Sequence, residues 1–120
     1  MSYRLIFEIE DLPKMANITS GKSHWRYAHV EAKKWQVLVH AAIGSQRPPE
    51  PLLRATLHLT RFSSSQPDYD GLVRGFKSIV DGLVRSGVLV NDKLENTGAW
   101  NCSWERAPKN QGKVRVEVHG

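Results

Sequence analysis

Three aspartates are the residues whose type and spacing in this sequence could do chemistry. Asp68 and Asp70 stand one residue apart before an amphipathic stretch, and Asp92 closes the same segment. Carboxylates suit Mg²⁺, which keeps several waters and is normally held by one or two carboxylates plus substrate phosphate. The formal net charge of the chain is +5, so an acidic cluster within it predicts a metal site in a surface that attracts polyanions.

Two basic residues follow the aspartate pair at helical spacing. Arg74 comes one helical turn after Asp70, and Lys77 comes about two turns after it, roughly 10 Å along the axis. Either cation could lean toward the carboxylates. A second interpretation stays open, because Asp-x-Asp before a helix is often only a cap, and Arg74 can be an i,i+4 partner of Asp70.

The aspartate pair is predicted to open a helix that runs to about Arg85, with Gly87 at its C-terminal cap. Asp70 is the expected N-cap, and Asp68 and Asp70 should point the same way in the extended approach to the helix. The face predicted to be buried recurs at helical spacing and consists of Leu72, Phe76, Ile79, Val80 and Leu83.

The other predicted helix and strands must position the helix that follows the aspartate pair. Alternating apolar residues predict strands at 3–10, 53–60, 99–105 and 113–119, and the last two are expected to form an antiparallel hairpin. A helix is expected from near Ser23, with a buried face made of Ala28, Ala32, Trp35, Val39 and Ala42. The order β-α-β-α-β-β predicts one domain over 1–120. Its fold class is a small two-layer α/β sandwich, a mixed sheet of about four strands with two main helices on one face.

Composition excludes several classes of protein. Hydrophobic residues make up 40% and charged residues 24% of the 120 residues, as in a globular domain. No apolar run has transmembrane length, and the N-terminus lacks the apolar region of a signal peptide, so we expect a cytoplasmic protein without a membrane partner. Cys102 is the single cysteine, which excludes an intrachain disulfide and a thiolate zinc cluster, and we expect it to pack beside Trp100 and Trp104.

The pattern as a whole resembles the RusA-like family of Holliday junction resolvases, which are common in phages and prophages. The resemblance covers most of the chain. It depends on the segments Gly21-Lys22-Ser23-His24-Trp25-Arg26, Lys34-Trp35, Asp68-Tyr69-Asp70-Gly71-Leu72, Phe76-Lys77, Asp81-Gly82-Leu83 and Asn91-Asp92, and on the final alternating valine strand.

The resemblance implies a homodimeric, Mg²⁺-dependent endonuclease that resolves branched DNA by symmetric phosphodiester hydrolysis in recombination and repair, with Mn²⁺ as a substitute metal. It implies that Asp68, Asp70 and Asp92 ligate the metal and that a lysine acts in cleavage. We prefer Lys77 for that role; a shorter spacing in the family would select Arg74. The basic side chains expected to contact DNA are Lys22, His24, Arg26, Lys33, Arg61, Arg74 and Lys93.

An alternative function is a branched-DNA-binding module with weak or no catalysis. Gly71 stands where the family usually has asparagine, and Asn91 stands where it often has a second acid. A protein-binding domain that uses Trp100 and Trp104 is a third possibility, which no other feature of the sequence favours.

Overall fold

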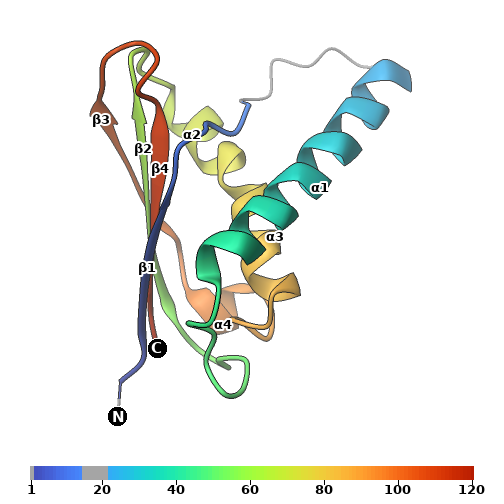
Figure 1. Ribbon diagram of the computed structural model, residues 1–120, viewed down its shortest axis with the longest axis vertical. Helices are drawn as coiled ribbons and strands as arrows, with labels where there is room; N and C mark the ends of the chain where they lie inside the picture. The colour runs from blue at the N-terminus through green and yellow to red at the C-terminus, as the bar shows by residue number, and fades with distance from the viewer. Residues whose placement is uncertain (1, 15–21) are drawn as a thin grey trace.

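The computed structural model describes residues 2–14 and 22–120, and of residues 22–28 it describes the backbone. The elements in these ranges are β1 (Arg4–Ile9), α1 (Lys22–Ile43), β2 (Thr56–Ser63), α2 (Tyr69–Gly75), α3 (Lys77–Arg85), α4 (Leu94–Thr97), β3 (Asn101–Arg106) and β4 (Lys113–His119). The strands form one layer and the helices cover one of its faces (Figure 1). The predicted α/β sandwich with a mixed sheet and the order β-α-β-α-β-β is therefore confirmed.

The strand order within the described residues is β1-β4-β2-β3. β4 runs antiparallel to both β1 and β2, whereas β2 and β3 run parallel. The prediction that 99–105 and 113–119 form a hairpin is therefore wrong, because β2 lies between β3 and β4. Residue alternation indicates which face of a strand is buried and does not specify its neighbour. The short connection 107–112 passes the end of β2, where the N–H of Ala107 donates to the carbonyl of Ser63.

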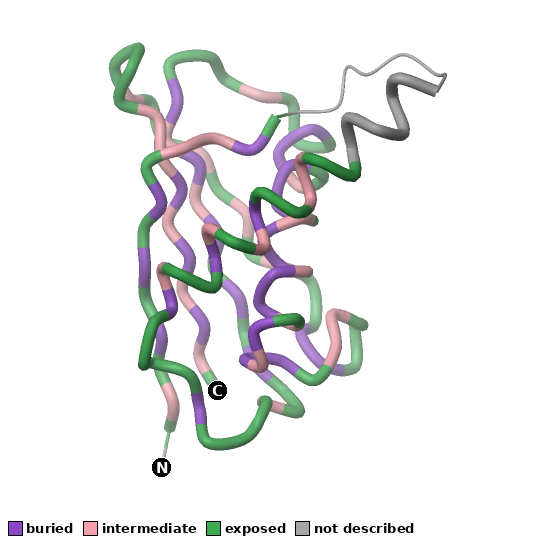
Figure 2. The backbone as a smooth tube through the Cα atoms, turned by 45° about the vertical axis from the view of Figure 1, so that its right-hand side comes forward, coloured by how far each residue is buried: buried purple, intermediate pink, exposed green. Residues whose placement is uncertain are grey.

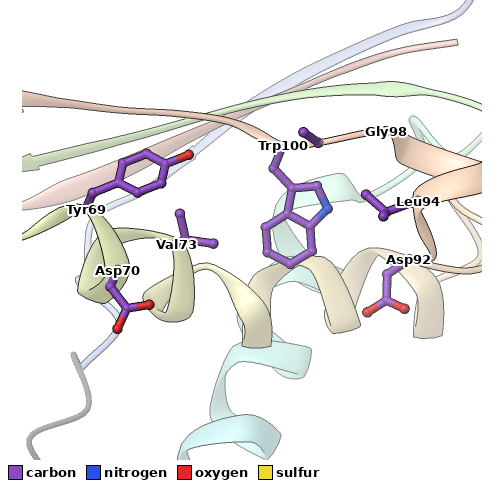
Figure 3. A pocket seen from close by; sticks show the side chains of 8 residues that line it. Tyr69, Asp70, Val73, Asp92, Leu94, Gly98 and Trp100 are labelled. Carbon is purple, nitrogen blue, oxygen red and sulfur yellow. The ribbon is translucent and has the colours of Figure 1, made fainter.

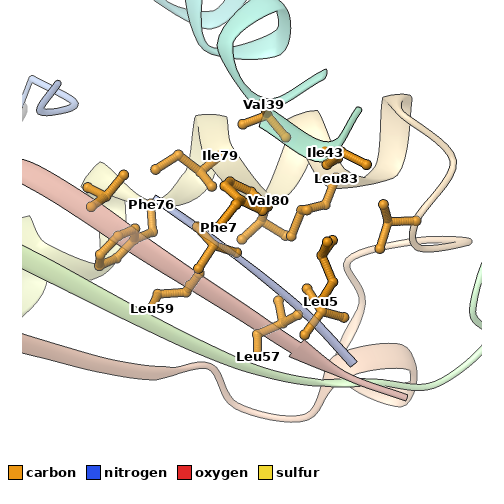
Figure 4. Packing of buried hydrophobic residues seen from close by; sticks show 14 of the residues in the cluster. Leu5, Phe7, Val39, Ile43, Leu57, Leu59, Phe76, Ile79, Val80 and Leu83 are labelled. Carbon is orange, nitrogen blue, oxygen red and sulfur yellow. The ribbon is translucent and has the colours of Figure 1, made fainter. Parts of the chain in front are cut away.

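The hydrophobic core lies between the sheet and the helices (Figure 4). Buried and exposed residues alternate along β1 and β2, as the period of a strand requires, and in Figure 2 the buried positions follow that pattern. The predicted valine face of β4 is confirmed. The helices contribute much of the rest of the core. α1 supplies Trp35, Val39 and Ile43, α3 supplies Ile79, Val80 and Leu83, and Phe76 lies directly before α3.

The predicted single helix after the aspartates consists of two helices. α2 ends at Gly75, and the N–H of Phe76 bonds the carbonyl of Val73 in a tighter turn before α3 begins at Lys77. Glycine has the weakest helix propensity of the residues other than proline, so a break beside Gly75 costs little. The apolar face predicted from Leu72 to Leu83 is nevertheless buried as expected, because the break leaves Phe76 directed into the core.

α3 ends as predicted near Gly87. This residue has a φ of +82°, and the N–H of Val88 bonds the carbonyl of Leu83 while the N–H of Gly87 bonds that of Val84, which is the Schellman pattern. Leu89 then forms an isolated parallel β-bridge with Leu52. The chain continues into α4, a short helix that the sequence did not predict. Among the described residues, no helix combines the length and hydropathy that spanning a membrane requires.

Candidate functional site

A pocket of about 390 Å³ lies where α2, the segment before α4 and the segment before β3 meet. α2 contributes one wall and packs against β3. β3 pairs in parallel with β2, and the start of β3 at Asn101 lies opposite His58 near the start of β2. The residues that line the pocket are Tyr69, Asp70, Val73, Asp92, Leu94, Gly98, Ala99 and Trp100 (Figure 3).

Asp68 is the N-cap of α2, so the prediction that Asp70 has this role is wrong. The N–H of Gly71 donates to Oδ1 of Asp68 at 2.8 Å, and the N–H of Leu72 bonds the Asp68 carbonyl. Asp70 lies inside the first turn of α2. The expectation that Asp68 and Asp70 point the same way assumed an extended chain through both residues, whereas only Asp68 has extended backbone dihedrals.

Asp70 and Asp92 both line the pocket, and each is paired with a cation. Arg74 forms an ion pair with Asp70 one helical turn away. Lys77 bonds Asp92 and also lies 3.1 Å from Asp81, so it ties α3 to the segment before α4. The hydrogen bond from Lys77 holds the pKa of the Asp92 carboxyl below its usual range, and the same bond raises the pKa of Lys77.

The two carboxylates lie at opposite ends of the pocket, with Val73 and Trp100 between them (Figure 3). Among residues 2–14 and 22–120, no three histidine, cysteine, aspartate or glutamate side chains gather closely enough to hold a metal ion. Asp68, Asp70 and Asp92 therefore do not fit a preformed three-carboxylate metal site in this arrangement. What the site offers instead is two separate carboxylate–cation pairs that flank an apolar surface.

The residues expected to contact DNA have different surroundings. Lys33, Arg74 and Lys93 are exposed. Arg61 is directed inward from β2 with 9% of its surface exposed, and its Nη1 donates to the carbonyl of Pro13 at 2.8 Å. Burial lowers the pKa of Arg61. In this arrangement the Arg61 side chain is buried and does not lie on the surface. The side chains of Lys22, His24 and Arg26 lie outside the described residues.

The sequence did not predict the apolar part of the pocket. Tyr69 is 71% exposed and Leu94 is 77% exposed, while Trp100 is half-buried. The position of Tyr69 was a usable signal, because an aromatic residue between two aspartates lies outside the buried helical stripe. Trp100 gave no such signal, since the alternation of its strand predicts only packing. Cys102 is half-buried, and burial raises its pKa to about 11, which agrees with the predicted packing role.

Comparison of the chain with protein-family models and with curated proteins finds no match.

Proposed function

We propose that this protein is an endodeoxyribonuclease of the RusA-like type, which cuts Holliday junctions by symmetric phosphodiester hydrolysis as a homodimer with Mg²⁺ or Mn²⁺. One observation carries the proposal: two carboxylates of a single pocket, Asp70 and Asp92, are each paired with an exposed cation, Arg74 or Lys77. A DNA phosphate competes with a carboxylate for such a cation. When a phosphate replaces the carboxylate as the partner of the cation, the DNA is bound and the carboxylate is released beside it.

The chemistry follows from charge. Hydrolysis of a phosphodiester places negative charge on the phosphoryl oxygens and the leaving oxygen, and a cation held beside them stabilises it. Lys77 is our preferred cation, with Arg74 as the alternative. A bound divalent cation offsets the same charge and lowers the pKa of its water. Because Mg²⁺ is commonly held by one or two carboxylates plus substrate phosphate, DNA would supply ligands that the three aspartates do not.

The direct test is incubation of the pure protein with a synthetic four-way junction and Mg²⁺. Paired, symmetric nicks in opposite strands are the expected product, because a two-fold dimer presents one site to each of two equivalent strands. Absence of cleavage with Mg²⁺ and with Mn²⁺, over several junction sequences, would exclude the proposal. Sedimentation supplies the second measurement, since a monomer of 13.6 kDa both with and without junction would contradict the dimer.

Three variants separate binding from chemistry. Asp70→Asn should reduce cleavage by about 100-fold or more and leave junction binding intact or tighter, because Arg74 loses its carboxylate partner. Lys77→Ala should also lose cleavage with little loss of affinity, since one phosphate contact among many carries a small share of binding. Arg74→Ala is the matched control. If it abolishes cleavage while Lys77→Ala does not, Arg74 is the active cation.

The second candidate is a branched-DNA-binding module without catalysis. The observation that favours it is the separation of the carboxylates, since no three metal-ligating side chains converge among the described residues. In such a module Asp68 is only a helix cap and Asp70 only a partner of Arg74. Tight junction binding without cleavage, unchanged by Asp70→Asn, would identify this function. Equal cleavage by Asp70→Asn and wild type would also refute the role of Asp70 in a metal site.

A further inference from the structure

Trp100 presents a fixed indole ring to the pocket. Its Nε1 donates to Oγ1 of Thr97 at 3.2 Å, and the same hydroxyl donates to the carbonyl of Gly98 at 2.8 Å. Thr97 is buried. Because the polar atom of the indole is satisfied by a buried partner, the orientation of the ring is set before any ligand arrives. Figure 3 shows the ring directed into the space between α2 and the segment before β3.

The surroundings of Trp100 are apolar and unusually open. Tyr69 and Leu94 are the most exposed large hydrophobic residues among those described, and both line the pocket together with Val73. An exposed apolar patch with polar residues at its rim marks a binding surface. Here the rim consists of Asp70 with Arg74 on one side and Asp92 with Lys77 on the other.

We propose that this pocket binds one unstacked nucleobase of a DNA strand, with the base stacked on Trp100. The inference depends on the proposed function in taking DNA as the ligand. The aromatic wall matches the face of a base, the carboxylate at either end of the pocket, Asp70 or Asp92, can accept from an N–H group on the base edge nearest to it, and Arg74 and Lys77 match the adjoining phosphates. Branched DNA supplies such a base, because stacking is interrupted at a branch point.

The chemistry of the pocket favours a base over other occupants. Its volume of about 390 Å³ is at the lower end of the range for small-ligand sites, roughly 300–1,000 Å³. A purely aliphatic side chain would cover Asp70 and Asp92 without offering them a donor, which is unfavourable. Stacking alone is tolerant of sequence, since every base has a π face. The pocket therefore assists binding at many junction sequences.

The test compares two single-stranded oligonucleotides with the same number of phosphates, one of which carries abasic sites at its central positions. Binding is measured in EDTA, so neither metal nor cleavage enters. Wild type should bind the base-bearing strand about 5- to 100-fold more tightly than the abasic strand. Trp100→Ala should bring this ratio close to one, and Trp100→Phe should keep most of it because the aromatic face remains.

Trp104→Ala is the matched control. Trp104 is the other half-buried tryptophan of this region, its Nε1 donates to Oγ of Ser63 at 2.9 Å, and it does not line the pocket. Trp104→Ala should leave unchanged the ratio between the affinities for the base-bearing and the abasic strand. Equal wild-type affinities for the two strands, no DNA binding at all, or loss of the ratio in Trp104→Ala as much as in Trp100→Ala would overturn the inference. Junction cleavage together with equal affinity for the two strands would refute base binding in the pocket and leave the nuclease proposal standing. Tighter binding of the base-bearing strand without junction cleavage would refute the nuclease proposal and leave base binding standing.

Discussion

Gly82→Ala tests the contact that holds α3, and with it Lys77, against α1. A Cβ atom built on Gly82 would lie 3.0 Å from Cβ of Val39 and 3.1 and 3.3 Å from its two Cγ atoms. Val39 is fully buried, so it cannot turn away into solvent. The glycine of the Asp81-Gly82-Leu83 pattern is therefore explained by close helix packing and needs no role in chemistry.

Two opposing free energies decide the outcome. Alanine in place of glycine inside a helix gains about 0.8–1 kcal/mol of propensity. A methyl group forced into a packed core costs about 1–3 kcal/mol. We expect Gly82→Ala to lower the free energy of unfolding by about 1 kcal/mol. Val39→Ala removes two methyl groups, for a loss of roughly 1.6 kcal/mol or more. Val39→Ala removes the two Cγ atoms but keeps the Cβ at 3.0 Å, so in the double variant the second substitution should cost less than Gly82→Ala costs alone.

Urea unfolding followed by circular dichroism gives the four free energies of this cycle. Gly87→Ala is the control, because a Cβ there meets nothing within 4 Å and its cost comes from the φ of +82°. That cost, about 1–2 kcal/mol, should add to the cost of Val39→Ala without coupling. A Gly82→Ala variant more stable than wild type, or one whose loss simply adds to that of Val39→Ala, would refute the packing argument.

Three further predictions concern single side chains. Asp68→Ala should lower the free energy of unfolding by about 1 kcal/mol through loss of the bond from Gly71, whereas Asp68→Asn should retain most of it in the same urea assay. Arg61→Met should change the free energy of unfolding by less than about 1 kcal/mol, because no carboxylate pairs with this buried cation in the described part of the chain; a larger loss would show that the bond from Arg61 to the Pro13 carbonyl stabilises the fold. NMR titration should find the pKa of Asp92 below the usual aspartate range, and Lys77→Met should return it there. A lowered carboxyl pKa stabilises the fold above the unfolded pKa, near 4, and this contribution is lost as the pH falls through the folded value.

The spacing of apolar residues and the residues that end helices predicted much of the fold. The buried stripe from Leu72 to Leu83, the valine face of β4 and the cap at Gly87 follow from local rules, and the structure has all three. Strand pairing did not follow, because the partner of β3 is chosen by the sheet as a whole. The N-cap prediction was wrong by two residues, since Asp68 and Asp70 are equally good capping residues and only the surrounding chain selects between them.

The same limit applies to the candidate site. The sequence marked Asp70, Asp92 and Lys77, and these side chains do lie around one pocket or at its rim. The i,i+4 pairing of Arg74 with Asp70 was one of the interpretations left open, and the structure has it. The pairing of Lys77 with Asp92 could not be predicted, because it joins α3 to the segment that follows the bridge between Leu52 and Leu89. The position of Trp100 in this pocket could not be predicted for a similar reason, since the pocket forms where α2 packs against β3.

The ion pairs of the site make a distinct prediction about salt. Each cation that neutralises a DNA phosphate adds about 0.9 to the slope of log affinity against log salt concentration. Lys33 is exposed and forms no ion pair within the described residues, so Lys33→Ala should reduce the slope by nearly that amount if DNA covers this face of α1. Arg74 already neutralises Asp70, so Arg74→Ala should reduce it by much less. Asp70→Asn frees Arg74, and in that background Arg74→Ala should recover the full effect. Junction binding of the wild type, the three single variants and the double variant, measured between about 50 and 200 mM salt, gives the five slopes that this comparison needs. Equal effects of Arg74→Ala in wild type and in Asp70→Asn would mean that DNA meets Arg74 without breaking its ion pair, and the exchange between phosphate and carboxylate on which the proposed function depends would be refuted.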